Sequence, residues 1–184
     1  MAKNGVLIES MIQAKNIDAL NRSVVATVDV AGGSLIALTA PTKQGEDRWT
    51  AVAPSSSALT GLWIAYNPSV RYTEVNGKLF AGLSADDRDY TNIANHTFDA
   101  FKPKIGDEIV ITADNVDADT VANVVAGDTL ESKAGQLTFT RVAGSTATTG
   151  HTAFNVEWVG TLEFPKAGIG VESVKAFKAV CVQE

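Results

Sequence analysis

The chain has 184 residues, a formal net charge of −6 and a sequence pI near 4.9. Because affinity for nucleic acid depends on neutralising phosphates, an acidic chain without a Lys/Arg cluster is not expected to bind DNA or RNA. The single cysteine, Cys181, excludes a disulfide within the chain, and its apolar neighbours predict a buried, unreactive thiol.

The first residues, "MAKNGVLIESMIQAK", are not expected to form a secretory signal, because Glu9 and Ser10 interrupt the apolar run. No segment reaches the apolar length that spans a bilayer, so we expect no membrane partner and folding in the cytoplasm.

The same N-terminal region is rich in apolar residues at helical spacing. Val6, Leu7, Ile8, Met11 and Ile12 include two pairs four residues apart, which fits a short amphipathic helix within residues 5–20. They fit an extended arm that buries its apolar side on a partner equally well. Packing against the core of the chain itself is the third interpretation, and the sequence leaves all three open.

Strands joined by turns are predicted next. The stretch "VVATVDVAGGSLIALTA" predicts a hairpin with strands 23–28 and 34–39 that double back at Gly32-Gly33, where positive φ is easily adopted. Residues 41–58 are rich in Pro, Gly and Ser and predict a loop.

Three further segments complete the first half of the chain. The apolar run "LTGLWIAYNP" predicts a strand that stops at Asn67-Pro68. Asn76-Gly77 predicts a second hairpin between two short strands. Residues 84–100 are polar and predict a loop with a helical turn, and their acidic cluster at 86–89 is interpreted as a solvated surface with a weak ion pair.

The second half predicts more strands. Residues 108–113 alternate, and "FNVEWVGTLEF" places Phe154, Trp158 and Phe164 on one face of a half-buried strand. Only "ADTVANVVAGD" (118–128) has a helical pattern. We therefore predict a mainly β fold, a small antiparallel barrel or sandwich with an irregular N-terminal lobe and an apolar N-terminal arm. The predicted divisions are an arm at 1–23, a hairpin-rich lobe at 24–101 and a barrel or sandwich subdomain at 102–184.

No pattern predicts chemistry. His96 and His151 stand alone in different loops, where a zinc site needs closely spaced ligands. The calcium-like start at Asn115 fails where a calcium loop needs Gly and Glu, because Thr120 and Ala126 stand there. No P-loop, dinucleotide fingerprint or nucleophile elbow occurs. We expect no catalytic residue, no cofactor and no metal, and thus a protein that is not an enzyme.

The tryptophans could serve a different purpose. Trp49, Trp63 and Trp158 could form a sugar-binding platform, which would make the chain a carbohydrate-binding module, but such residues more often anchor a core or an interface.

The stretch "NGVLIESMIQAKNIDALNRSVVATVDVAGGSLIALTA" resembles the start of the head-decoration (cement) proteins of tailed bacteriophages. The resemblance continues loosely through "GLWIAYNP" and "TFDAFKPKIGDEIVIT" to "TAFNVEWVGTLEF". It implies a structural virion protein, made in the host cytoplasm, that binds the major capsid protein on the outside of the head, often as a homo-oligomer.

On this interpretation the apolar arm, with Val6, Leu7, Ile8, Met11 and Ile12, would supply the contact with the capsid by lying across a subunit or adding a strand to it. Many weak contacts repeated over a shell would add up to strong binding. The alternatives are another virion component, such as a tail tube or a head fibre, and the carbohydrate-binding module.

Overall fold

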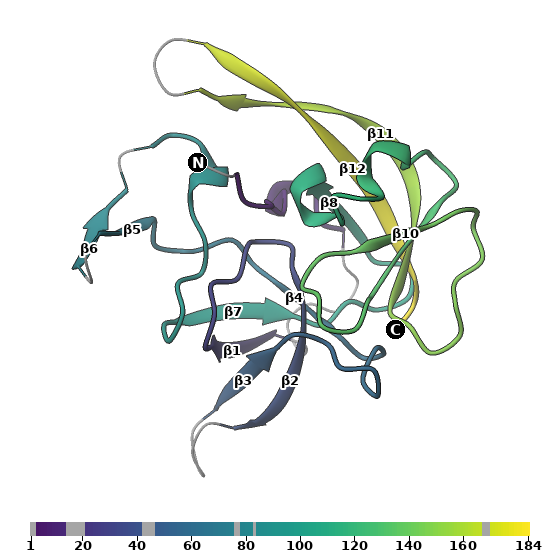
Figure 1. The fold of residues 1–184 in the computed structure, drawn as a ribbon, viewed down its shortest axis with the longest axis horizontal. Coiled ribbons are helices and arrows are strands. Elements are labelled where there is room, and N and C mark those ends of the chain that lie inside the picture. Colours follow the sequence, from purple (N-terminus) through teal and green to yellow (C-terminus); the bar gives the residue numbers. More distant parts are fainter. Residues whose placement is uncertain (1–2, 14–20, 42–46, 76–77, 83, 167–169) are drawn as a thin grey trace.

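The chain is mainly β in the computed structural model, which describes residues 3–13, 21–41, 47–75, 78–82, 84–166 and 170–184 (Figure 1). A closed barrel has the strand order β1-β3-β2-β4-β7. Its strands are β1 (Asn21–Ala26), β2 (Leu35–Pro41), β3 (Arg48–Val52), β4 (Trp63–Ala65) and β7 (Thr97–Phe101). This confirms the mainly β prediction, although one barrel pair, β1 with β3, is parallel.

A five-stranded antiparallel sheet has the order β10-β9-β11-β12-β8. Its strands are β8 (Glu108–Thr112), β9 (Thr129–Glu131), β10 (Thr140–Val142), β11 (Ala153–Pro165) and β12 (Val171–Gln183). A separate hairpin consists of β5 (Tyr72–Val75) and β6 (Lys78–Ala81). The helical elements of the described residues are single 3-10 turns: η1 (Glu9–Met11), η3 (Asp87–Asp89), η4 (Ala113–Asn115) and η5 (Val121–Asn123).

One core joins the barrel to the sheet. Its buried side chains come from both bodies: Leu35, Leu62, Ile64, Phe101, Ile109, Ile111, Leu130, Phe139, Phe154 and Phe177 are among them. The rings of Phe139 and Phe154 pack edge to face at 5.6 Å between centroids, the geometry that aromatic pairs favour. A second, smaller core fills the barrel. The predicted subdomain boundary near residue 102 stays a prediction. Residues before and after this position contribute side chains to the same core and pack against one another there.

The predicted hairpin at Gly32-Gly33 is wrong. Strands β1 and β2 both form, but β3 lies between them and pairs parallel with β1 and antiparallel with β2. Strand β3 lies inside the stretch predicted as loop, residues 41–58, and β7 occupies the end of the predicted loop 84–100. Strands β1 and β7 pair to close the barrel. They are far apart in the sequence, and local turn residues cannot predict such a pairing.

The other strand predictions have mixed outcomes. Strands β4, β8 and β11 confirm the predicted segments, and β5 pairs with β6 across the Asn76-Gly77 position, which itself lies outside the described residues. The predicted helix at 118–128 is wrong, because only the turn η5 forms there. The β-branched valines of this segment disfavour a longer helix.

Trp158 does not share the buried face of Phe154. A register shift lies between Val156 and Trp158, where β11 pairs with β12. A bulge of this kind turns the following side chains to the opposite face. Trp158 is accordingly 42% exposed.

Candidate interaction surface

The N-terminal segment, residues 3–13, crosses the molecule as a strap and lies against the edge of the sheet. Leu7 bridges Ile111 and Gln13 bridges Glu108, both antiparallel to β8. The Gln13 and Glu108 backbones exchange hydrogen bonds of 3.0 and 2.7 Å, and Ile8 N–H donates to the Val110 carbonyl at 2.8 Å. The strap therefore covers an otherwise open sheet edge, which would be a template for unwanted pairing.

The arm residues divide into two groups in this conformation. Val6 and Leu7 are buried within the chain itself, at 3% and 0% exposure. Ile8 and Ile12 are half-buried, and Met11 is exposed. The amphipathic helix is not formed over residues 5–13, which contain only the turn η1, and the rest of its predicted range, 14–20, lies outside the described residues. A contact of these five residues with a partner stays a prediction. Val6 and Leu7 are not accessible for such a contact in this conformation, because they are buried within the chain itself.

Asn67 clamps the strap by its side chain. Its Oδ1 accepts from the Leu7 N–H at 3.0 Å, and its Nδ2 donates to the Leu7 carbonyl at 2.6 Å. The amide thus satisfies both backbone groups of one residue, as a neighbouring strand would. A second amide, the buried Asn115, donates to the Gly32 carbonyl at 2.7 Å. These two side chains tie the strap, the barrel and the sheet together.

The double glycine serves this junction rather than a hairpin turn. A Cβ placed on Gly32 would lie 1.8 Å from Oδ1 of Asn67. Gly33 has φ +80°, and its Cβ would lie 2.8 Å from Nδ2 of Asn115. The backbone approaches both amides so closely that only glycine fits without displacing them.

Replacing Gly32 with alanine should therefore push the Asn67 side chain off Leu7 and destabilise the fold by about 1–3 kcal/mol, as overpacking does. Urea denaturation followed by tryptophan fluorescence measures the change. Gly127→Ala measures backbone strain without a steric clash, because φ is +90° there and a Cβ meets no atom within 4 Å. The matched control is Gly32→Ala in an Asn67→Ala background, where Oδ1 of Asn67 is absent and the substitution should cost less. A Gly32→Ala protein that is as stable as the wild type would contradict the clamp.

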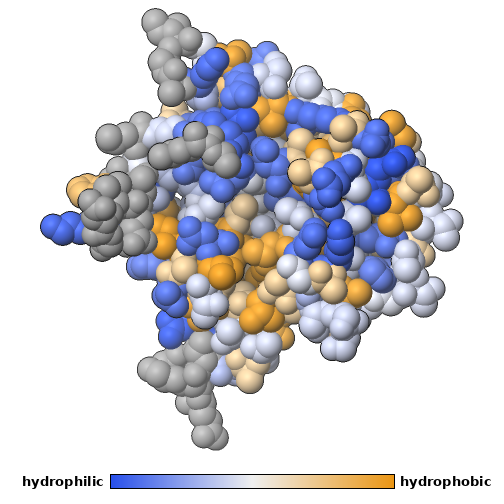
Figure 2. Space-filling model, viewed as in Figure 1, coloured by the Kyte–Doolittle hydropathy of each residue, from blue (hydrophilic) through white to orange (hydrophobic). Residues whose placement is uncertain are grey.

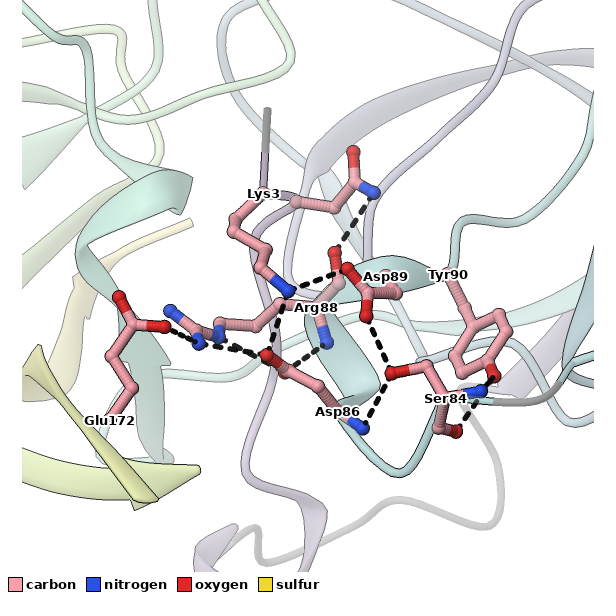
Figure 3. A network of polar contacts seen from close by, with 8 residues as sticks. Lys3, Ser84, Asp86, Arg88, Asp89, Tyr90 and Glu172 are labelled. Carbon is pink, nitrogen blue, oxygen red and sulfur yellow. Dashed lines mark hydrogen bonds and ion pairs between the residues drawn. The ribbon is translucent and has the colours of Figure 1, made fainter. Parts of the chain in front are cut away.

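A buried polar network holds the first residues of the strap (Figure 3). The Arg88 guanidinium binds Asp86 by two contacts, Nε to Oδ1 at 3.0 Å and Nη2 to Oδ2 at 2.8 Å. Its Nη2 also lies 2.7 Å from Oε2 of Glu172 on β12. Lys3 Nζ reaches Asp86 at 3.0 Å and Asp89 at 2.6 Å. The network connects the strap, η3 and the β11–β12 ribbon.

This network corrects the interpretation of the acidic cluster as a solvated surface. The side chains of Arg88 and Asp86 are only 3% and 2% exposed. The Arg88 guanidinium carbon also lies 5.0 Å from the ring centroid of Phe164. Charged residues are rarely buried unless they are paired, but a run of mixed charges in the sequence does not reveal which of them are covered.

The charges of the network stabilise one another. Burial on its own raises the pKa of Asp86, but hydrogen bonds from Arg88 and Lys3 outweigh it and lower that pKa to about 2. The hydrogen bond to Asp86 raises the pKa of Arg88. Hydrogen bonds to Asp89 and Asp86 raise the pKa of Lys3. Asp86, Arg88 and Lys3 are therefore all ionised at neutral pH.

An open groove of about 1660 Å³ lies beside the strap. Its walls come from the strap, the first residues of β1 and β3, and the segment 66–72. Both signs of charge line it, and Arg71 pairs with Asp87 on its wall. In Figure 2, hydrophilic residues cover much of the visible face, and hydrophobic ones gather over the barrel.

Three of the exposed apolar side chains lie within residues 70–80. Val70 is 52% exposed, Tyr72 40% and Phe80 53%. Tyr72 and Phe80 belong to the β5–β6 hairpin, which forms a two-stranded sheet of its own and projects from the body (Figure 1). Tyr72 pairs with Ala81 and Phe80 pairs with Thr73, so Tyr72 and Phe80 lie on opposite faces of the hairpin. We call Val70, Tyr72 and Phe80, which expose apolar groups on both faces of this element, the hairpin surface. Apolar groups exposed on a projecting element are typical of a contact with another macromolecule.

The remaining candidates are placed apart. Trp49 and Trp63 pack against the core of the barrel, and Trp158 lies on β11 of the sheet. His96 is exposed, and His151 contacts the Ser132 carbonyl at 2.8 Å through Nδ1. Cys181 is buried as predicted, and burial raises the pKa of its thiol to about 12.

The described residues contain neither a cluster that could hold a metal ion nor a helix that could span a membrane. No group of three or more His, Cys, Asp or Glu side chains is placed there to hold a metal ion. No helix in the described ranges has the length and apolar character needed to cross a membrane.

Comparison with known proteins finds no matching family model, no matching curated protein and no matching solved structure.

The structure adds residues that the sequence interpretation missed: Asn67 and Asn115 as clamps, Asp86 and Arg88 as a buried pair, and the hairpin surface. The hairpin had a signal in the sequence, the Asn-Gly turn, and the cluster at 86–89 was predicted to hold an ion pair. The two clamps and the burial of the Asp86–Arg88 pair depend on contacts between segments far apart in the chain.

Proposed function

We propose that this chain is a structural virion protein that binds the outer surface of a tailed-bacteriophage head and stabilises it. Its partner is the major capsid protein, and its copies act together as oligomers on the shell. The resemblance of its sequence to head-decoration proteins supports this function, as does its acidic, mainly β body.

The observation that carries the proposal is the hairpin surface. A contact on a capsid needs exposed apolar or aromatic side chains on an element that reaches away from the body, since such side chains dominate binding energy. Tyr72 and Phe80 meet this requirement, whereas Val6 and Leu7 of the strap are buried. We therefore assign the capsid contact to the hairpin surface in place of the buried part of the arm.

The double variant Tyr72→Ser, Phe80→Ser should bind heads at least roughly 30-fold more weakly than the wild type, since two aromatic anchors contribute about 2 kcal/mol or more. Co-sedimentation with empty heads, assembled from the capsid protein of the same phage, measures the affinity. Both side chains are exposed, so the thermal midpoint of the free protein should change little.

The matched control is Ile105→Ser, which removes a side chain that is 60% exposed elsewhere on the surface. It should bind heads like the wild type. If the double variant binds heads as tightly as the control does, the hairpin surface is not the capsid contact. If negative-stain microscopy of the protein shows tubes or rings and no binding to heads, the tail-tube alternative replaces the proposal.

A further inference from the structure

Among the described residues, the strap is held by parts of the chain that are distant from it. Apart from the two hydrogen bonds of its own turn η1, its hydrogen bonds within these residues go to Asn67, to the segment 86–89 and to β8. In the side-chain bonds, these partners stand between 58 and 106 residues along the chain from the strap residue that they bind. The site that accepts the strap is therefore formed by the body and not by the neighbours of the strap in sequence.

The acceptor site resembles a peptide-binding site of the strand-addition type. Strand β8 offers its edge to residues 6–13, and main-chain hydrogen bonds of this kind provide affinity. The Leu7 side chain is fully buried in this site, and the Asn67 side chain hydrogen-bonds both the N–H and the carbonyl of Leu7. At one end, Asp86 and Asp89 take the ammonium group of Lys3. Apolar, polar and ionic contacts together specify one segment in one register.

We propose that the strap is exchanged between copies of this chain, so that the strap of one copy occupies the acceptor site of a second copy. Every contact described above is the same whichever copy supplies the strap, so exchange costs no contact energy and is governed by concentration. The partner is thus a second copy, and it contributes Lys3, Val6 and Leu7 to the site. The inference concerns the free protein and does not depend on binding to heads.

Effective concentration decides between the closed and the exchanged form. A segment held by a short linker competes at roughly millimolar effective concentration. The closed monomer is therefore expected in dilute solution, and exchanged dimers or larger assemblies are expected as the protein itself approaches that concentration.

The test traps the strap in its register by a disulfide. Gln13 and Glu108 form a hydrogen-bonded antiparallel pair, in which Cα atoms lie about 5.5 Å apart, within the range that a disulfide spans. The full-length double variant Gln13→Cys, Glu108→Cys is unfolded in urea, refolded at a series of concentrations and then oxidised. Non-reducing electrophoresis separates the internally linked monomer from covalent dimers.

The proposal predicts mostly monomer at micromolar concentration and about half of the chains in covalent dimers or larger species near the millimolar effective concentration. The control Gln13→Cys alone measures the cross-linking that arises from collisions at each concentration, and the dimers of the double variant should clearly exceed it. Internally linked monomer at every concentration, with no rise in dimers, would overturn the proposal.

A second measurement covers the case in which the double variant does not refold. A synthetic peptide of residues 3–13 is added to the full-length Leu7→Ala protein, whose own strap is weakened while its acceptor site is intact. The peptide should raise the thermal midpoint of this protein and bind it at least roughly tenfold more tightly than it binds the wild type. A peptide with Leu7→Ala should have no effect. If the wild-type peptide at millimolar concentration also has no effect, the acceptor site does not take a strap from outside, and the proposal is wrong.

Discussion

The Arg88→Met variant should have a free energy of unfolding about 3 kcal/mol lower than the wild type. Removing one partner of a buried ion pair leaves an uncompensated charge, which costs about 3–5 kcal/mol, and the contact of Asp86 with Lys3 at 3.0 Å keeps the loss near the lower end. The methionine retains apolar contact with Phe164. Urea denaturation at pH 7 measures the change. A loss below about 1 kcal/mol would show that the pair is not buried as described.

Two controls separate the charge of Asp86 from the packing of Arg88. The double variant Asp86→Asn, Arg88→Met removes both charges, so it should recover part of the loss of stability.

The pKa of Asp86 is lowered to about 2 in the folded state, from a usual value of 3.8. The stability that its carboxylate contributes is therefore complete above about pH 4 and is lost as the pH falls towards 2, by about 2 kcal/mol in total. Asp86→Asn should lack this part of the acid loss, and an identical acid profile in wild type and variant would contradict the assignment.

The Leu7→Ala variant should lose about 3 kcal/mol of stability, because it leaves a cavity at a fully buried position between the strap and the core. Met11→Ala is the matched control within the strap: this side chain is 46% exposed, so the loss should stay below about 0.5 kcal/mol. Thermal and urea unfolding of both variants measure the difference. Equal stability of the two variants would mean that the strap does not dock on the core in solution.

The strap, the ion-pair network and the surface charge together suit a protein that works at high local density. The strap covers the edge of β8, and the barrel closes its own edges, so few strand edges remain to pair with neighbours. A net charge of −6 opposes non-specific association. Neighbouring copies would then meet only through specific contacts, such as strap exchange.

The sequence predicted elements whose signal is local. The hairpin at Asn76-Gly77 and the strands at 108–112 and 153–165 follow from turn residues and alternation, and they were found. The prediction failed where pairing is distant. The alternating residues on both sides of Gly32-Gly33 look like a hairpin, but β3 inserts between the two strands, and the two glycines are required by Asn67 and Asn115.

The candidate surface was predictable only in part, for a similar reason. The apolar pattern of the N-terminus indicates that the segment must be covered, but it does not distinguish a partner from the chain itself. Burial of Leu7 is decided by Ile111 and Asn67, which stand far along the chain. The alternation in 153–165 also misplaces Trp158, since a single bulged residue reverses the faces.

Cryo-electron microscopy of empty heads incubated with a molar excess of the purified protein tests the function most directly. We predict density on the outside of the shell at regular positions on the capsid lattice, oriented so that the β5–β6 hairpin points into the capsid protein and is contacted on both of its faces, at Tyr72 and at Phe80. Bare shells at saturating protein, with heads that withstand heat no better than before, would contradict a role as a capsid-binding structural protein.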